Sequence, residues 1–390
     1  MYPDLSYLFH DLLGTARDNW LSIFKTFGFF LLCAFLVAKW LLTLELRRRE
    51  RIGQLAGEET DRIPGKTVTV WDYVFNAVFG FLLGYKIPYA VANLPTWKRD
   101  PTGVLLSGEG FWWTGLLVAA AFVGYYHWIA KQQSAAPAVD TATTVYPSDR
   151  VGIITALAAV GGILGAKAFA IAEYFPRFLE DPIGVLFSGD GLAIYGGLIG
   201  GFLAVFWYIR RHGIPALPLM DAVAPGLIVA YGVGRIGCQL SGDGDWGIAS
   251  GPVPQGWGLP DWTYGFDFPH NVLRRGEAIA GCEDLYCQVL PNLHYPTSLY
   301  ETLMAFTIGG LLWALRKRLT RLPGMLFALY LVLNGIERFC IEFIRVNDRY
   351  GFLGVELSQA QFIAIGFMVV GIAMALFVRR VGPQNLAAPN

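Results

Sequence analysis

The segment VGIITALAAVGGILGAKAFAIAEY, residues 151–174, decides the fold class. It is apolar along almost its whole length, with Lys167 and Glu173 as its two charged residues. About 20 such residues are what an α-helix needs to cross the hydrocarbon core of a bilayer. Blocks of similar length recur along the chain, so the sequence predicts an all-α polytopic integral membrane protein.

The composition is typical of a chain that lies mostly in lipid. Of its 390 residues, 54% are hydrophobic and 15% are charged, against about 25% charged in an average soluble domain. Thirty basic residues balance thirty acidic ones, so no net field favours a polyanion. The sequence therefore excludes a soluble enzyme, a coiled coil and a disordered chain, and it predicts no nucleic-acid partner.

Nine apolar segments indicate about nine transmembrane helices. They lie near residues 22–45, 71–93, 111–131, 151–174, 192–210, 218–240, 297–315, 323–344 and 358–379. No cleavable signal sequence is expected before them. Residues 1–21 carry scattered charges and predict a short interfacial helix.

Basic residues follow every second one of these segments, beginning with the first. They are Arg47, Arg48, Arg49 and Arg51, then Lys131 and Arg150, then Arg210 and Arg211, then Arg316, Lys317, Arg318 and Arg321, and finally Arg379 and Arg380. Because Lys and Arg accumulate on the cytoplasmic side, we expect a periplasmic N terminus and a cytoplasmic C terminus.

The longest loop, residues 241–296, then lies outside the cytoplasm. It is rich in Gly, Pro and Trp, which predicts an ordered, small extracytoplasmic cap. Cys282 and Cys287 stand in it as GCEDLYC. An oxidising compartment permits a bridge between them, but the spacing has no special signature, so a disulfide and two free thiols stay open as alternatives.

The chain contains an internal duplication. Residues 80–115 align without a gap on residues 161–196 at an offset of 81, with 14 of 36 positions identical. Both copies keep the direction of their helices, so this is a parallel repeat and not an inverted transporter repeat. The expected organisation is an N-terminal part with the first span and a cytoplasmic loop (1–70), an extra hairpin with a periplasmic arm (71–131), core helices with a second arm (150–240), the periplasmic head (241–296) and the C-terminal helices (297–380).

Ionisable residues inside membrane helices are costly and usually functional. In the eighth span Asn334, Arg338, Glu342 and Arg345 recur at steps of four, four and three, which places them on one helical face. Glu342 is expected to hold both arginines and to leave spare positive charge, which suits a phosphate. The alternative is a salt bridge that only ties helices together.

Further charged residues stand at the ends of the sixth and seventh spans. Arg235 lies within GVGRIGCQLSGDGDWG, and Asp243 and Asp245 follow it. The alternative for this motif is helix-packing glycine with an interfacial anchor. Tyr300 and Glu301 open the seventh span, where a buried carboxylate needs a partner. Together these segments predict at least three arginines and several acids near the outer leaflet, which suits a phospholipid headgroup.

The chain resembles a family, the bacterial prolipoprotein diacylglyceryl transferases. The matching stretches are GLAIYGGLIG (191–200), GVGRIGCQLSGDGDWG (232–247), YPTSLYE (295–301) and IERFCIEFIR (336–345). The resemblance implies an enzyme of the bacterial inner membrane that transfers the diacylglyceryl group of phosphatidylglycerol to the lipobox cysteine thiol of a preprolipoprotein. Glycerol phosphate is released, and no nucleotide, metal or other cofactor is implied. The family usually has seven spans, so the pair near 71–131 is an addition.

The resemblance also implies roles for single residues. Arg235 matches the motif arginine, and Arg338 and Glu342 match a later Arg and Glu; these would bind the phosphate and stabilise charge on the departing glycerol phosphate. Asp243 takes the place of a family glutamate, and Gly247 falls on the closing glycine of its motif.

This chain departs from the family pattern at several positions. Tyr195 stands at the family's histidine, Cys238 at an asparagine, Phe27 at a tyrosine, and Tyr295, preceded by His294, at a second histidine. A thiol of pKa about 8.5 needs a base, and a tyrosine of pKa about 10 is a poor one. Tyr195 can still donate a hydrogen bond to a phosphate or a carbonyl.

Three functions follow from this pattern. The first is the family reaction; the second is a paralogous phospholipid-dependent transferase with another acceptor or donor; the third is a non-enzymatic lipid-binding or lipid-translocating protein. The predicted catalytic residues are Tyr195, Arg235, Arg338 and Glu342, and the predicted substrate-binding residues are Arg235, Cys238, Asp243, Gly247, Tyr300, Glu301, Arg338 and Arg345.

Overall fold

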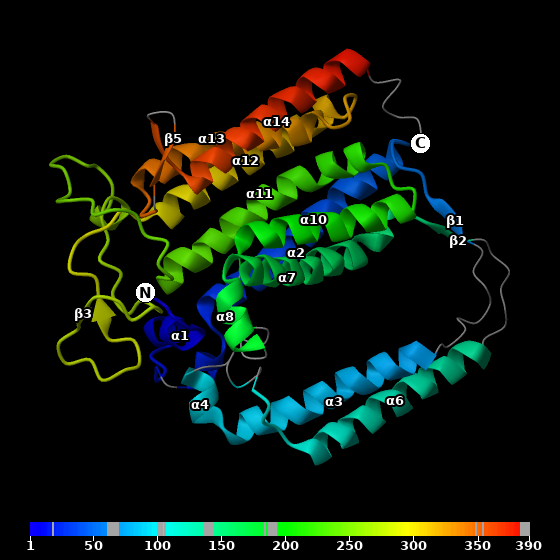
Figure 1. The fold of residues 1–390 in the computed structure, drawn as a ribbon, viewed down its shortest axis with the longest axis horizontal. Coiled ribbons are helices and arrows are strands. Elements are labelled where there is room, and N and C mark those ends of the chain that lie inside the picture. Colours follow the sequence, from blue (N-terminus) through cyan, green and yellow to red (C-terminus); the bar gives the residue numbers. More distant parts are fainter. Residues whose placement is uncertain are drawn as a thin grey trace. The chain divides into compact units, whose positions relative to one another are not determined.

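The structure is a computed structural model. It describes residues 1–17, 19–60, 70–99, 104, 107–135, 143–182, 185, 193–347, 349–352 and 355–382. Long helices dominate this part of the chain (Figure 1), and its strands are short two-stranded ladders. The chain is therefore a polytopic all-α membrane protein, as predicted.

Among the described residues, six helices are long and apolar enough to cross a membrane. They are α2 (Thr26–Arg51), α3 (Val70–Ala92), α7 (Val151–Glu173), α11 (Ala216–Ser241), α12 (Thr297–Leu319) and α14 (Gln359–Val381). Three more helices lie at the other expected spans: α6 (Trp112–Ala135), α10 (Ile194–Arg211) and α13 (Met325–Ile341). The 17 residues of α13 extend about 25 Å, less than the hydrocarbon core of about 30 Å. A total of nine crossings stays a prediction.

The chain divides into two compact units, and the first contains residues 1–56, 147–155 and 206–390. In this unit α11 packs against α2 and α12, and α13 packs against α12 and α14 (Figure 1). Ile228, Ala305, Leu312 and Leu326 form one fully buried cluster of its core. Small residues bring the helices close: a Cβ on Gly309 would lie 2.5 Å from a methyl group of Val229.

The basic end of α2 is tied into this unit by buried ion pairs. Glu45 accepts a hydrogen bond from Nε of Arg49 at 3.0 Å, and both side chains are buried. Asp221 of α11 accepts from the backbone N–H groups of Gly324 and Phe327, each at 2.8 Å, and so caps the start of α13. Nη2 of Arg49 lies 3.8 Å from Oδ2 of Asp221. This arrangement joins α2, α11 and α13 at the end opposite to the α11 C terminus.

The segment between α11 and α12 forms an ordered head. It contains η3 (Asp261–Thr263) and the ladder of β3 (Glu277–Ala278) with β4 (Gln288–Val289), and Trp246, Phe268 and Leu290 are buried together in it. Cys282 and Cys287 form a disulfide, which decides between the two alternatives left open by the sequence. The predicted N-terminal helix is α1 (Leu5–Leu13), followed by η1 (Trp20–Ile23). Tyr7 of α1 packs edge-on against Tyr286 of the head.

The second unit contains residues 57–146 and 156–205, and its helices reproduce the duplication. α3 and α7 begin at Val70 and Val151 and end at Ala92 and Glu173, a shift of 81 at both ends. The short helices α4 (Leu94–Arg99) and α8 (Phe175–Glu180) show the same shift. A Cβ on Gly84 would lie 2.4 Å from the Thr114 carbonyl oxygen, and one on Gly165 would lie 2.3 Å from that of Gly196. The repeat therefore extends to the close packing of each hairpin.

The remaining elements are short. They are β1 (Glu58–Thr60) paired with β2 (Thr143–Val145), η2 (Pro147–Arg150), η4 (Glu342–Ile344), and the hairpin of β5 (Arg349–Phe352) with β6 (Val355–Ser358). The S-G-D-G turn of the second repeat lies outside the described residues.

Candidate active site

Three helix ends of the first unit supply the charged residues of the candidate site. α11 ends at Ser241, α12 begins at Thr297 and α13 ends at Ile341. Arg235 comes from the last two turns of α11, and Arg338 comes from the last turn of α13. Both side chains, together with that of Arg345 beyond η4, reach one carboxylate.

That shared carboxylate belongs to Glu301, which is fully buried in α12. Its Oε2 atom lies 3.1 Å from Nε of Arg235. Its Oε1 atom accepts hydrogen bonds from Nη1 of Arg338 and from Nη1 of Arg345, each at 3.2 Å, and from the Tyr231 hydroxyl at 3.1 Å. Charge-assisted hydrogen bonds are roughly twice as strong as neutral ones, so Glu301 organises the three arginines.

Asp245 provides a second bridge between two of the arginines. Its Oδ2 atom accepts from Nη1 of Arg235, and its Oδ1 atom accepts from Nη2 of Arg345 at 2.5 Å. Burial alone would raise the pKa of the Asp245 carboxyl, but the guanidinium groups of Arg235 and Arg345 outweigh burial and hold that pKa below its usual value. Asp245 is therefore ionised at neutral pH.

Of the two arginines that Glu342 was predicted to hold, the structure confirms one. Its Oε2 atom lies 3.0 Å from Nη2 of Arg338, as expected, and its Oε1 atom accepts from the Asn347 amide. The expectation that it also holds Arg345 is wrong, because Arg345 binds Glu301 and Asp245 instead. The physical reason is that α13 ends at residue 341, so the helical face does not continue to Arg345, whose backbone is extended.

The expected spare positive charge is also wrong. Each of the guanidinium groups of Arg235, Arg338 and Arg345 contacts a carboxylate. A carboxylate beside each arginine keeps the buried charges compensated, which low dielectric requires. The site is a balanced ionic network, and an anionic ligand has to compete with an acid for its arginines.

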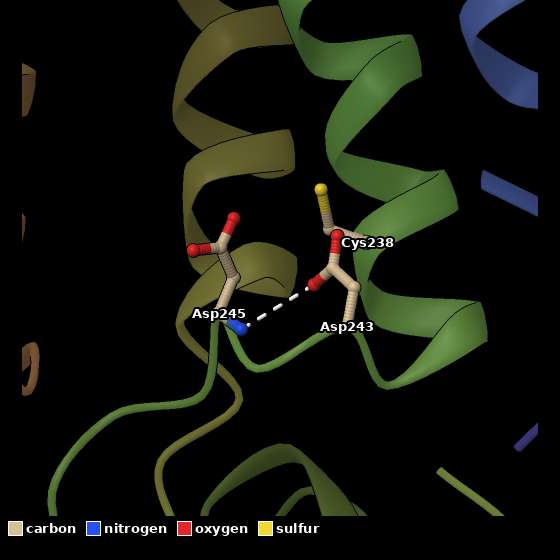
Figure 2. Close-up of side chains that lie close together, drawn as sticks. All are labelled: Cys238, Asp243 and Asp245. Carbon is tan, nitrogen blue, oxygen red and sulfur yellow. Dashed lines mark hydrogen bonds between the residues drawn. The ribbon is translucent and has the colours of Figure 1, made fainter. Parts of the chain in front are cut away.

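Cys238, Asp243 and Asp245 lie together beside this network (Figure 2). Asp243 accepts the backbone N–H of Asp245 at 3.3 Å, and burial and the neighbouring Asp245 carboxylate raise the pKa of the Asp243 carboxyl. The three ligand atoms lie within 4.8 Å of one another, a spacing that a metal ion could use. Asp245, however, already binds two guanidinium groups, and Nη1 of Arg235 lies 3.9 Å from the Cys238 sulfur. This positive charge opposes a cation.

Two predicted binding residues have structural contacts. The Tyr300 hydroxyl donates to the carbonyl of Thr263 at 2.7 Å and so ties α12 to the head. Gly247 donates its N–H to the carbonyl of Tyr295 at 2.8 Å, and a Cβ there would lie 2.5 Å from the carbonyl oxygen of Ile344. Only glycine permits this close approach. It brings the backbone of Gly247 against the segment that carries Arg345.

The positions that differ from the family pattern are spread over the fold. Tyr195 lies near the start of α10 in the second unit, and its side chain is outside the described part of the structure, so its role stays a prediction. Nδ1 of His294 lies 2.7 Å from the carbonyl oxygen of Gly247. Phe27 of α2 lies beside Gly237 of α11.

Asp245, Tyr231 and Glu337 belong to the site but are absent from the predicted set. Tyr231 precedes Arg235 by four residues, and the guanidinium lies 5.0 Å from the centre of its ring; this spacing is a helical signal that could have identified it. Glu337 is 3% exposed, and within the described part of the chain neither of its carboxylate oxygens has a hydrogen-bond partner. It stands next to Arg338 in the IERF motif, but its neighbourhood in the sequence alone does not predict that it faces the site.

The helices and this network define a polytopic membrane protein with an ionic site between its helices. The chain belongs to the prolipoprotein diacylglyceryl transferase family, whose model matches residues 105–377. The matched range contains every predicted site residue and begins after α3.

Several curated relatives share this family. The phosphatidylglycerol–prolipoprotein diacylglyceryl transferase of Clostridium tetani is 29% identical over 229 residues, which cover 58% of this chain and 80% of the relative. Transferase 2 of Clostridium perfringens is 33% identical over 232 residues, 59% of this chain and 79% of the relative. The transferase of Chromohalobacter salexigens is 27% identical over 286 residues, 72% of this chain and 93% of the relative.

Proposed function

We propose that this chain is a phosphatidylglycerol-dependent prolipoprotein diacylglyceryl transferase of the bacterial inner membrane. The observation that carries the proposal is the convergence of Arg235, Arg338 and Arg345 on Glu301, in a chain of this family. The names of the relatives supply the donor and the acceptor class. The proposal needs no cofactor and no metal.

The proposed reaction exchanges one bond for another. The thiol sulfur of the acceptor cysteine forms a bond to the glyceryl carbon as the bond from that carbon to the phosphate oxygen breaks. The thiol proton is released to solvent and the phosphate oxygen keeps the electron pair of the broken bond, so the products are a thioether-linked lipid and glycerol phosphate as a dianion. Negative charge develops on the phosphate oxygen in the transition state, and fixed guanidinium groups stabilise such charge best where water is excluded.

The proposed roles follow the contacts. Arg235 and Arg345 face the part-exposed Asp245 and would bind the phosphate, while Arg338 would add positive charge from α13. Glu301 and Glu342 hold the guanidinium groups in position. Cys238, Asp243 and Tyr300 would line the approach of the headgroup, and Tyr195 would donate a hydrogen bond. The head at residues 241–296 would face the periplasm, where the preprolipoprotein is presented.

One observation favours a second candidate, a paralogous phospholipid-dependent transferase with a different acceptor. Tyr195 and Cys238 stand where the family carries histidine and asparagine, so the binding residues are kept while a proposed base is changed. A tyrosine removes a thiol proton poorly. An acceptor that needs no strong base would suit this chain equally well.

The test uses the purified full chain in vesicles that contain phosphatidylglycerol, with a lipobox peptide as acceptor. The proposal expects a thioether-linked peptide and glycerol phosphate in equal amounts, both detected by mass spectrometry. Arg235→Ala should abolish both, whereas Arg379→Ala, an exposed change at the end of α14, should abolish neither. Binding of phosphatidylglycerol without a thioether product would reject the family reaction and leave the second candidate.

A further inference from the structure

The arginines of the site are already paired with carboxylates, which limits how a phosphate can reach them. The three arginines of the network, Arg235, Arg338 and Arg345, are each bound to a carboxylate. A phosphate that binds the guanidinium nitrogens now in contact with carboxylates therefore has to replace at least one of those carboxylates. The carboxylate that yields must be reachable and must leave without unfolding the helices around it.

Glu301 and Asp245 each bridge Arg235 and Arg345, but their surroundings differ. Glu301 is fully buried within α12 and also accepts the Tyr231 hydroxyl. The Asp245 side chain is 30% exposed and comes from the loop after α11. A ligand from outside the helix bundle therefore meets Asp245 first.

The geometry of Asp245 matches what a phosphate would do. Its two oxygens separate onto two guanidinium groups, one from α11 and one from the extended segment after η4. The two non-bridging oxygens of a phosphodiester can divide between two arginines in the same way. We infer that Asp245 is a stand-in for the phosphate: its carboxylate bridges the two arginines that the phosphate would bind, and it rotates away when the headgroup binds. This inference rests on the proposed function and names the residue that controls access to its site.

The backbone around Asp245 supports a rotation of the side chain alone. The Asp245 carbonyl accepts the Thr297 hydroxyl and, at 3.4 Å, that of Ser298. Two residues later the N–H of Gly247 donates to the Tyr295 carbonyl at 2.8 Å. The backbone of the loop is therefore held at Asp245 and at Gly247 by residues 295–298, and the Asp245 carboxylate can exchange partners without moving it.

A returning carboxylate also helps the product to leave. Glycerol phosphate, a monoester, carries more negative charge than the diester from which it forms, so bare arginines would retain it. Asp245 stays tethered beside them and competes at every release. The apparent affinity for a ligand falls by the fraction of molecules in the competent state, so the stand-in weakens the binding of substrate and product alike.

The experiment measures glycerol phosphate binding to the full chain in phosphatidylcholine nanodiscs by calorimetry, with the melting temperature recorded for each variant. Asp245→Asn keeps the size of the side chain and removes its charge, and Asp245→Ala removes both. We expect both variants to bind glycerol phosphate about tenfold more tightly, as for a competent fraction of about one tenth. Asp261→Asn, the same charge change at an exposed position of the head, should leave the affinity unchanged.

Two results would overturn the inference. Unchanged or weaker binding in a folded Asp245→Asn protein would make Asp245 a fixed clamp for the arginines. Loss of folding in Asp245→Asn would also make Asp245 a fixed structural residue, because a carboxylate that leaves in each turnover cannot be required for the fold. The transferase assay is separate: tighter binding without any thioether product rejects the proposed reaction alone, and thioether formation with weaker binding rejects the stand-in alone.

Discussion

Glu301 accepts a hydrogen bond at 3.2 Å from Arg345, a residue that lies beyond the last helical turn of α13. The contact joins the first turns of α12 to a non-helical segment, and Arg235 of α11 reaches the same carboxylate. The network thus depends on where α13 ends. Had the helix continued, Arg345 would have followed the face of Arg338 and Glu342.

Glu301→Gln should destabilise the protein and stop phosphatidylglycerol binding. The change keeps the shape of the side chain but leaves three guanidinium groups around a neutral amide in a buried position. Removing one partner of a buried ionic network costs about 3–5 kcal/mol. Thermal unfolding in detergent would measure the loss. Glu356→Gln, outside the network, is the control, and equal melting temperatures for the two variants would contradict the organising role of Glu301.

The sequence predicted the apolar helices, the duplication and most of the charged residues of the site. These depend on local signals, namely the length of an apolar block or the identity of a motif. The pairing within the site was not predictable, since it depends on tertiary contacts. Arg345 was assigned to a helical face that ends four residues earlier, and Asp245 was seen as a boundary acid because no periodicity links it to Arg235.

Tyr195 can be tested in the transferase assay. Tyr195→Phe should lower the rate of thioether formation by about tenfold, equivalent to about 1.4 kcal/mol in the barrier, if the hydroxyl donates a hydrogen bond to the substrate. Phosphatidylglycerol binding should stay within a factor of two or so, because the arginines are unchanged. Full activity in the Phe variant would remove Tyr195 from the site. Tyr195→His tests in parallel whether the family base raises the rate.

Asp221 offers a comparison between stability and binding. It lies 14 residues before Arg235 in α11, about 21 Å along the helix, and caps the start of α13 through two backbone N–H groups. Asp221→Ala should lower the free energy of unfolding by about 1–3 kcal/mol, and glycerol phosphate should bind the folded variant as it binds the wild type. Calorimetry, at a temperature where the variant is folded, would compare the affinity of the two proteins for glycerol phosphate. A changed affinity would show that the two ends of α11 are coupled.

Replacing Glu337, unlike replacing Asp221, is expected to raise the stability of the protein. Its carboxyl group is buried next to Arg338, and in the described part of the chain its oxygens accept no hydrogen bond. A buried carboxyl without a partner costs free energy, about 1–3 kcal/mol for a neutral group and more for a charged one. Glu337→Leu should therefore raise the melting temperature, since it replaces this group by an apolar side chain of similar size. Glu337→Gln is the control, because it keeps an unpaired polar group in the same place: we expect little gain in stability. A lower melting temperature in the Leu variant would mean that the carboxyl stabilises the fold, and this prediction would then be wrong.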